Sequence, residues 1–489
     1  MRSRDVFDNL SPLDHRYWET NRELFDALAD RLSDRASVRE CVKVEIALLK
    51  AHLAARGLSS EERFRELDAL EGSVDPGEVA REEAKTRHNI RALVNILASK
   101  VPAELAHLVH LGATSADILD TARALQFRSA VLEVLLPLLA RVLAQVARIA
   151  EEEAETAQVG RTHGRHAVPI TFGFAMAEYA ARLGKCLPRI EELARDLRGK
   201  LAGATGSYNA LAIVYPDPEG VEAAFLSFLD LRPSEHSTQI VEPEYLLRLL
   251  LELNVAFGIL ANLADDLRHL QRQEIDEVRE SFAGSQVGSS TMPQKRNPWN
   301  CEHVKSLWKA FAPRVLTFFL DQISEHQRDL TNSASERFAV EFLAGLGAAA
   351  NRIHGVLCSL SVDREQMGLN LRSGGGAVMA ELAYILLAES GRADAHEEVR
   401  RLTLAAEAEG ISFAEALERR PLLRQDLSAR LIALGHPDPW GFFVAPERYR
   451  GLAAQKARAL GKKYLELARR WQNGPVRATR TTSKPTEAP

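Results

Sequence analysis

Two long segments that are apolar on nearly every side constrain the fold of this chain most. Residues 131–149 and 245–270 are rich in Leu, Val and Ala, and the second begins just after Pro243. A helix without a polar face must be buried among several other helices, within one subunit or between subunits. The chain is therefore expected to fold around a bundle of long helices.

The rest of the sequence favours helices too. Val42, Ile46, Leu49 and Leu53 recur at alternating steps of four and three, which places them on one helical face. Charged residues make up 26% of the chain and aromatic residues only 6%, with Ala, Leu, Glu and Arg abundant, which is a helix-forming balance. Strand-like alternation is short and rare. We predict an all-α fold.

The predicted helices divide into three domains and a tail. We place a helical domain at residues 1–111, the long central bundle at 112–362 and a smaller helical domain at 363–472. The tail at 473–489 is rich in Thr, Pro, Arg and Lys and lacks apolar anchors, so we expect it to be disordered.

Charge and cysteine content narrow the possible functions. The formal net charge of -5 gives no reason to expect nucleic acid as a partner. No run of about 18 uncharged apolar residues is present, so no membrane span is predicted, and the first residues lack the apolar core of a signal peptide. The 4 cysteines are scattered without metal-ligand spacing. We therefore expect a reduced, cytoplasmic protein with no metal and no cofactor.

A polar segment at residues 288–298 carries the clearest chemistry. Glycine in its lead-in at 283–286 tolerates unusual backbone angles, so the loop is able to close over an anionic substrate. A serine acts as a base only if its alkoxide is stabilised, and Lys295, Arg296 and local N–H groups can stabilise Ser289. By composition alone, a polar surface loop explains the cluster equally well.

The segment resembles the signature of the fumarase/aspartase superfamily, S-S-x-M-P-x-K-x-N with a nearby Glu. Every fixed position is present from Ser289 to Asn297, and Glu302 follows. Two further blocks similar to those of the superfamily occur in the expected order, at residues 114–121 and at 160–169.

Other segments are similar to the adenylosuccinate lyase family within that superfamily. They are the element S-P-L-D-H-R-Y at residues 11–17 and the segments at 203–210, 237–239 and 328–333, with Arg337 just beyond. Argininosuccinate lyase and fumarase share the general blocks but not this set. The resemblance implies a homotetramer with a twenty-helix core and active sites shared between three subunits, so a monomer is expected to be inactive.

The resemblance also implies roles for the residues of the blocks. Ser289 would be the general base that removes a proton from carbon, and His163 the general acid that protonates the departing nitrogen. Lys295 and Asn297 would hold the succinyl carboxylate as a carbanion forms, and His88 would assist. An imidazole suits the acid role because it titrates near neutral pH, and a carbanion beside a carboxylate needs fixed positive charge.

The substrate-binding residues that the resemblance implies fall into three groups. Thr114 and Ser115 would bind a substrate carboxylate, where a helix N-terminus favours anions, although the same residues can serve only as a helix cap. Gln239 would contact the base or the succinyl part. The phosphate group would be bound by Arg16, Tyr17, Ser333 and Arg337. The remaining candidates are Arg165, Ser290, Met292 and Arg328.

Two positions depart from the family pattern. Arg165 stands where these lyases usually have Gln, and Asn89 where they usually have Asp. Arginine is longer, always charged and unable to accept a hydrogen bond, so Arg165 would pair with an extra anionic group or fill space beside a smaller substrate. Loss of the acid at Asn89 would remove a partner that raises the pKa of His88 or orients it.

Three functions therefore stay open. The first is release of fumarate from adenylosuccinate and from the succinyl-carboxamide intermediate of purine synthesis. The second is release of fumarate from another N-succinyl adduct, on an amine or a hydrazine, in a specialised pathway, which Arg165 and Asn89 favour. The third is a non-catalytic structural homologue.

Overall fold

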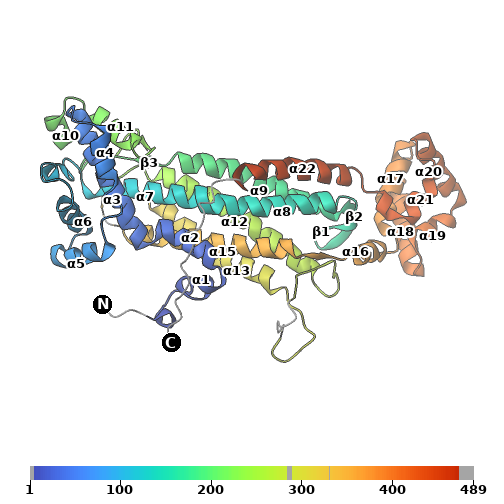
Figure 1. The fold of residues 1–489 in the computed structure, drawn as a ribbon. Helices are drawn as coiled ribbons and strands as arrows, with labels where there is room; N and C mark the ends of the chain where they lie inside the picture. The colour runs from blue at the N-terminus through green and yellow to red at the C-terminus, as the bar shows by residue number, and fades with distance from the viewer. Residues whose placement is uncertain (1–4, 283–288, 330, 473–489) are drawn as a thin grey trace.

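The computed structural model describes residues 5–282, 289–329 and 331–472. The glycine lead-in and the tail that were predicted from the sequence lie outside these residues. The described chain is an elongated molecule built almost wholly of helices, with short strands at a few junctions (Figure 1). The predicted all-α fold is confirmed.

Most of the N-terminal part forms one end of the molecule, and its first two α-helices lie beside the central bundle (Figure 1). Its α-helices are α1 (Arg16–Thr20), α2 (Arg22–Leu32), α3 (Asp34–Ala55), α4 (Glu61–Asp68), α5 (Pro76–Thr86) and α6 (Asn89–Ala98), and its 3-10 helices are η1 (Val6–Asp8), η2 (Pro12–Asp14) and η3 (Ala106–Leu108). Val42, Ile46, Leu49 and Leu53 are all buried in α3, as their spacing predicts. They belong to the same continuous hydrophobic core as the central helices.

Long helices form the central bundle. They are α7 (Ser115–Ala130), α8 (Leu136–Glu152), α9 (Phe172–Arg195), α12 (Glu244–Leu270), α13 (Trp299–Phe311), α14 (Arg314–Leu320) and α15 (Ser335–Cys358), with short α10 (Asn209–Val214) and α11 (Pro218–Ser227) at the N-terminal end. The π-helical turn η4 (Val131–Leu135) joins α7 to α8 just before Pro137. Proline cannot donate the normal helical hydrogen bond, and a π turn lets the helix continue past it.

The helices α7, η4 and α8 form one continuous rod of 38 residues, Ser115–Glu152. By length and composition alone this rod and α12 are each apolar enough to cross a membrane, but 72% and 56% of their most apolar windows are buried inside the molecule. More than half of each window is therefore buried by helix packing, as the sequence predicts for segments without a polar face.

A separate small core lies at the other end (Figure 1). It is formed by α17 (Ala380–Glu389), α18 (Ala395–Glu409), α19 (Phe413–Glu418), α20 (Pro421–Ala433) and α21 (Pro439–Val444), with η5 (Ala377–Met379) and η6 (Pro446–Arg448), after the linking α16 (Arg364–Arg372). The last helix, α22 (Ala453–Gln472), leaves this unit and returns along α8 and α9 (Figure 1). Its Tyr464, Ala468 and Trp471 lie in the core of the bundle. The boundaries near 111 and 362 remain proposals.

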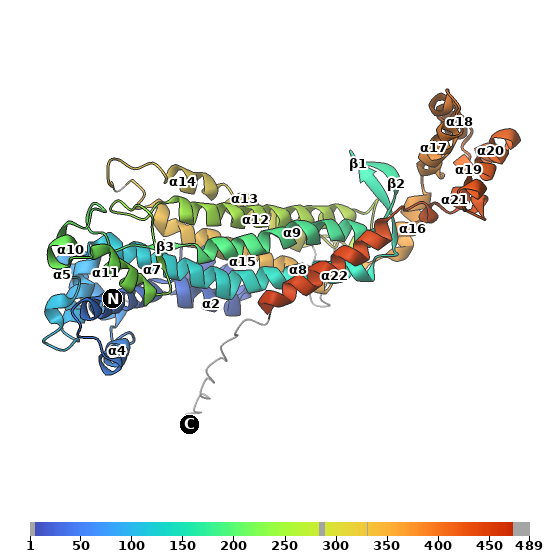
Figure 2. The same cartoon turned by 90° about the horizontal axis from the view of Figure 1, so that it is seen from above.

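The short strands form one hairpin and two pairings between distant parts of the chain. β1 (Ala157–Thr162) and β2 (Arg165–Thr171) form an antiparallel hairpin, β3 (Arg198–Gly199) pairs in parallel with β4 (Arg232–Pro233), and β5 (Val278–Arg279) pairs with β6 (Ser361–Val362). The hairpin stands at the end of the bundle nearest the small C-terminal unit (Figure 2).

Candidate active site

His163 lies at the tip of the β1–β2 hairpin. His163 and Gly164 both have left-handed backbone angles, with φ of 52° and 73°, and Thr162 pairs directly with Arg165. Two left-handed residues in a two-residue loop match the twist of a hairpin. The His163 side chain is exposed, so this chain offers it to solvent or to a neighbouring molecule.

The base of the hairpin is fixed by a buried carboxylate. Glu277 is fully buried, pairs with Arg161 at 2.6 Å and accepts hydrogen bonds from Gln158 at 2.7 Å and Asn370 at 2.9 Å. Three donors compensate this buried charge. Glu277 therefore anchors the first strand of the hairpin through Gln158 and Arg161.

Arg165 follows His163 on the second strand. Its side chain is exposed, and none of the residues that the structure describes forms an ion pair or hydrogen bond with it. The neighbouring His166 has its pKa lowered by partial burial and by the positive charges of Arg161 and Arg165. Arg165 thus places a positive charge next to the tip of the hairpin.

His88 and Ser115 meet at the opposite end of the bundle. His88 precedes α6 and accepts a hydrogen bond at Nδ1 from the Arg91 N–H at 3.2 Å, while its Nε2 lies 3.5 Å from Ser115 Oγ. Asn89 turns its side-chain oxygen to the N–H of Ile90 at 2.8 Å. His88 thus lies beside the start of α7 within one chain, a contact that the sequence did not predict.

Thr114 caps α7. Asp117 accepts a hydrogen bond from the Thr114 backbone N–H at 2.7 Å and completes a capping box. The helix-cap reading of this block is confirmed, and the start of a long helix also favours an anion. Binding of a carboxylate by Thr114 and Ser115 stays a prediction.

A second loop packs beside this helix start. A Cβ at Gly206, where φ is 81°, would lie 2.0 Å from the Ser237 carbonyl oxygen. Only glycine fits such an approach. The loop from Gly203 to Tyr208 therefore contacts the segment that carries the half-buried Gln239.

The signature segment lies between β5 and α13. Ser289 is half-buried, and its Oγ accepts a hydrogen bond from the Met292 N–H at 3.1 Å. Ser290, Met292 and Lys295 are exposed, and Asn297 is half-buried. Within this chain Ser289 thus takes part in a local turn, and the described part of the segment extends outside the bundle (Figure 1).

Glu280 holds the base of this segment. Its carboxylate accepts hydrogen bonds from the backbone N–H of Asn300 at 3.2 Å and of Cys301 at 3.0 Å, and from the Asn300 side chain at 2.8 Å. It therefore satisfies two of the free N–H groups at the start of α13. Sequence reasoning did not find Glu280, because it lies outside the signature pattern.

The predicted phosphate residues lie on two segments. Arg16 is exposed on α1, and the Tyr17 hydroxyl lies 2.9 Å from Nε2 of His303 on α13. At the start of α15, Arg337 donates to the Ser333 carbonyl at 3.2 Å. The structure links Tyr17 to the helix after the signature segment, and it places Ser333 beside Arg337.

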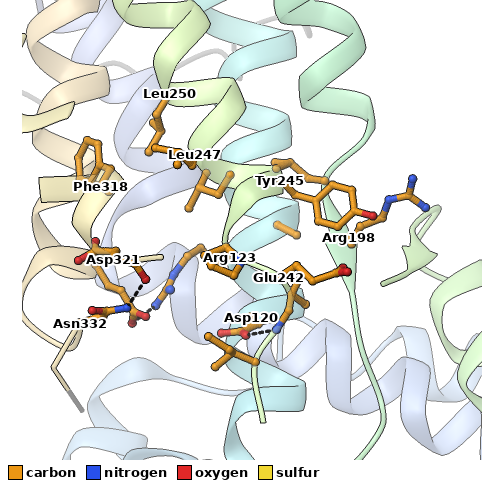
Figure 3. Close-up of a pocket in the computed structure, with 18 of the residues that line it drawn as sticks. Asp120, Arg123, Arg198, Glu242, Tyr245, Leu247, Leu250, Phe318, Asp321 and Asn332 are labelled. Carbon is orange, nitrogen blue, oxygen red and sulfur yellow. Dashed lines mark hydrogen bonds and ion pairs between the residues drawn. The ribbon is translucent and has the colours of Figure 1, made fainter. Parts of the chain in front are cut away.

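Arg328 borders a cavity of about 110 Å³ between α7, α12 and α15 (Figure 3). Leu247, Leu250 and Phe318 are among its apolar lining residues. Its charged lining residues are Asp120, Arg123, Arg198, Glu242, Asp321, Arg328 and Glu336. Both the segment after Gln239 and the segment before Ser333 line this cavity. Sequence reasoning identified Arg328 but not the other charged residues.

One chain does not bring all the candidates together. His88 and Ser115 precede or begin the rod Ser115–Glu152, whereas the His163 hairpin follows it. At about 1.5 Å per residue the rod is about 57 Å long, and Figure 1 shows the two groups at its opposite ends. A site that uses both His88 and His163 must therefore combine different copies of the chain.

Comparison with protein-family models gives two matches. A model described as lyase matches residues 15–310, and a model described as adenylosuccinate lyase C-terminal matches residues 324–438. Together they cover the described chain from residue 15 to residue 438, apart from residues 311–323.

Similar proteins extend over nearly the whole chain. Adenylosuccinate lyase of Archaeoglobus fulgidus is 33% identical over 94% of this chain and 98% of its own length, and that of Pyrococcus horikoshii is 33% identical over 93% and 97%. Among solved structures, a 3-carboxy-cis,cis-muconate lactonizing enzyme from Pseudomonas putida aligns with a TM-score of 0.76 and 26% identity, covering 91% of this chain and 97% of that one. A fumarate lyase from Mesorhizobium has the same TM-score at 22% identity, covering 89% and 97%, and supports the fold.

Proposed function

Since this chain belongs to the adenylosuccinate lyase family of the fumarase/aspartase superfamily and is a carbon–nitrogen lyase of the fumarate-releasing type, we propose that it acts on adenylosuccinate and on the succinyl-carboxamide intermediate of purine synthesis. The observation that carries this proposal is the near full-length similarity to two adenylosuccinate lyases. The non-catalytic alternative is set aside, because the chain is an enzyme. A cytoplasmic location is part of the proposal.

The proposed reaction is a β-elimination. Ser289, as an alkoxide, takes the proton from the carbon beta to the leaving nitrogen, and the electron pair left on that carbon forms the double bond of fumarate. The C–N bond breaks, and His163 gives its proton to the nitrogen that leaves. Lys295 and Asn297 stabilise the carboxylate whose negative charge grows before the bond breaks.

The exposed position of His163 supports its role as an acid presented to a neighbouring subunit. A histidine at the tip of an anchored hairpin can enter a site formed by another chain, whereas a core histidine cannot. Within one chain, a helical rod about 57 Å long separates the His163 hairpin from Ser115. We therefore propose a homotetramer in which each active site combines residues of different subunits.

The two ends of the substrate would bind to different segments. Thr114 and Ser115, at the N-terminus of α7, take a carboxylate of the succinyl group, with His88 3.5 Å from Ser115. Arg16, Tyr17, Ser333 and Arg337 take the phosphate, and Gln239 contacts the base or the succinyl part. Ser290, Met292 and Arg328 complete the proposed contacts.

A second candidate substrate is favoured by Arg165. Its guanidinium is exposed two residues from His163 and has no partner among the described residues. An unpaired cation beside the proposed acid suits a leaving group with an additional anion. The alternative is therefore another N-succinyl adduct, on an amine or a hydrazine, which also releases fumarate.

A fumarate-release assay with adenylosuccinate separates the two candidates. Turnover of roughly one to a thousand per second supports the purine substrate, and negligible turnover from a folded tetramer contradicts it. Arg165→Gln is the companion variant. If Arg165 serves another adduct, this change is expected to raise activity on adenylosuccinate, and an unchanged activity argues against a specificity role.

Subunit mixing tests the shared site. His163→Ala and His88→Ala are each expected to be nearly inactive. When the two variants are dissociated, mixed in equal amounts and reassembled, random pairing restores intact sites in roughly a quarter of cases. The control mixes His163→Ala with a chain that carries both substitutions, which has no intact His163. Equal, negligible activity in both mixtures would contradict a site shared in this way.

A further inference from the structure

Glu336 connects two segments that hold predicted substrate residues. At the start of α15 it pairs with Arg123 of α7 at 2.8 Å and with Arg328 at 3.6 Å. Arg123 lies two helical turns after Ser115, and Arg328 lies before Ser333. One carboxylate thus joins the helix that begins with Thr114 and Ser115 to the segment with Arg328, Ser333 and Arg337.

The three side chains are largely shielded from water. Their exposed fractions are 27% for Arg123, 16% for Arg328 and 23% for Glu336. Burial alone would lower the pKa of Arg123, but the charges of Glu336 and Asp120 outweigh it and hold that pKa above its ordinary value. Ion pairs in such surroundings hold their geometry better than exposed pairs, because water and salt screen them less.

Neighbouring hydrogen bonds connect the segment after Gln239 to the helix that carries Arg123. Asp120, one turn before Arg123, accepts a hydrogen bond from the Val241 N–H at 3.0 Å, two residues after Gln239. On the other side Asn332 donates to the Asp321 carbonyl at 2.7 Å, and Ser335 donates to the Asp321 carboxylate at 2.8 Å. Figure 3 shows Arg123 reaching from α7 toward the side of the cavity where Asp321 and Asn332 lie.

We propose that Glu336 is a positioning residue that sets the spacing between the α7 N-terminus and the segment of Arg328, Ser333 and Arg337. The inference rests on the proposed function, in which a substrate spans both places with a carboxylate at one end and a phosphate at the other. A substrate held at both ends binds productively only if those ends are correctly spaced. Each product touches only one side and is insensitive to the spacing.

Glu336→Gln tests the proposal, and Glu341→Gln is a matched control. Glu341 lies on the same helix, is 26% exposed and pairs with Arg314 at 2.5 Å. For Glu336→Gln we expect the KM for adenylosuccinate to rise about tenfold or more, with kcat within about threefold of wild type, which marks a loss of binding rather than of chemistry. Inhibition by fumarate alone and by AMP alone is expected to change less than about threefold. Glu341→Gln is expected to match wild type.

Several results would overturn the proposal. A KM equal to that of Glu341→Gln would show that Glu336 does not position the site. A parallel loss of AMP affinity would show that Glu336 supports phosphate binding directly. A lower melting temperature with unchanged KM would leave only a structural role.

If the proposed substrate is wrong, the wild-type enzyme will not turn over adenylosuccinate at all, which distinguishes that outcome from the results above. The role of Glu336 is then tested by amide hydrogen exchange. Faster amide exchange around Asn332 in Glu336→Gln, but not in Glu341→Gln, is expected if Glu336 holds this segment in place. Equal exchange in the two variants would overturn the inference without reference to any substrate.

Discussion

Asp117 and Lys200 form a fully buried ion pair between the first turn of α7 and the segment after β3. Asp117 also accepts hydrogen bonds from the backbone N–H groups of Thr114 at 2.7 Å, Ala202 at 3.1 Å and Gly203 at 3.2 Å. This carboxylate therefore holds the proposed carboxylate-binding helix start against the neighbouring loop. Its charge is compensated by Lys200 and its oxygens by backbone donors.

Asp117→Asn is expected to destabilise the protein by about 3–5 kcal/mol, because it leaves the Lys200 charge buried without a partner. Chemical denaturation followed by circular dichroism measures the change. The double variant Asp117→Asn/Lys200→Met removes both charges and is expected to recover much of the loss. A double variant no more stable than the single one would show that the hydrogen bonds, and not the charge pair, dominate.

His52 is expected to make stability depend on pH. It is buried, its Nδ1 lies 2.7 Å from the Tyr215 hydroxyl and its Nε2 lies 3.0 Å from the Leu111 carbonyl, which suits the neutral ring with a proton on Nε2. Burial, with a contribution from Arg56, lowers its pKa from 6.5 to about 4. The folded state therefore excludes a proton that the unfolded state binds.

The free energy of unfolding is therefore expected to fall as the pH is lowered. The contribution of His52 is complete above pH 6.5, where both states are neutral, and it is lost as pH falls from 6.5 to about 4. The loss amounts to about 3 kcal/mol. Urea unfolding across this range is expected to show a shallower pH dependence for His52→Gln than for wild type. The exposed His269→Gln is the control, and identical slopes for wild type and His52→Gln would contradict the prediction.

The contact of α22 with α9 depends on a glycine. A Cβ at Gly184 would lie 2.2 Å from the Tyr464 ring, so Gly184→Ala is expected to destabilise the protein by about 1–3 kcal/mol through overpacking. Thermal unfolding measures the change. Gly355 is also helical but has nothing within 4 Å of its position for a Cβ. Gly355→Ala is therefore expected to stabilise the protein by about 1 kcal/mol, and equal effects of the two changes would argue against the helix contact.

Glu280 is expected to affect the signature segment through α13. Glu280→Ala removes the acceptor for the N–H groups of Asn300 and Cys301, a loss of about 1–2 kcal/mol for a helix cap. Amide exchange at these two residues is expected to accelerate, and turnover is expected to fall because Lys295 and Asn297 immediately precede the helix. Glu274→Ala removes an exposed pair with Arg272 and is the control. Unchanged exchange in Glu280→Ala would exclude the cap role.

Much of the fold could be predicted from local sequence patterns. Burial of α3 follows from its apolar periodicity. Burial within the rod from Ser115 to Glu152 and within α12 follows from segments that lack a polar face. The cap at Thr114 was likewise readable, since a capping box spans only four residues. The family could be predicted because its sequence motifs occur in the expected order along the chain. The hairpin around His163 was not foreseen, because its strands are short and are held by Glu277, more than a hundred residues away.

The arrangement of the site depended on contacts between distant residues. No local pattern reveals that Glu336 joins Arg123 to Arg328, that Lys200 neutralises Asp117 or that Glu280 caps α13, because each contact forms only when the helices pack. Helical periodicity reports which side of a segment is buried but not what it is buried against. The separation of His163 from His88 has the same origin. The rigid rod between them sets their distance, and only the folded chain shows that one copy cannot bring them together.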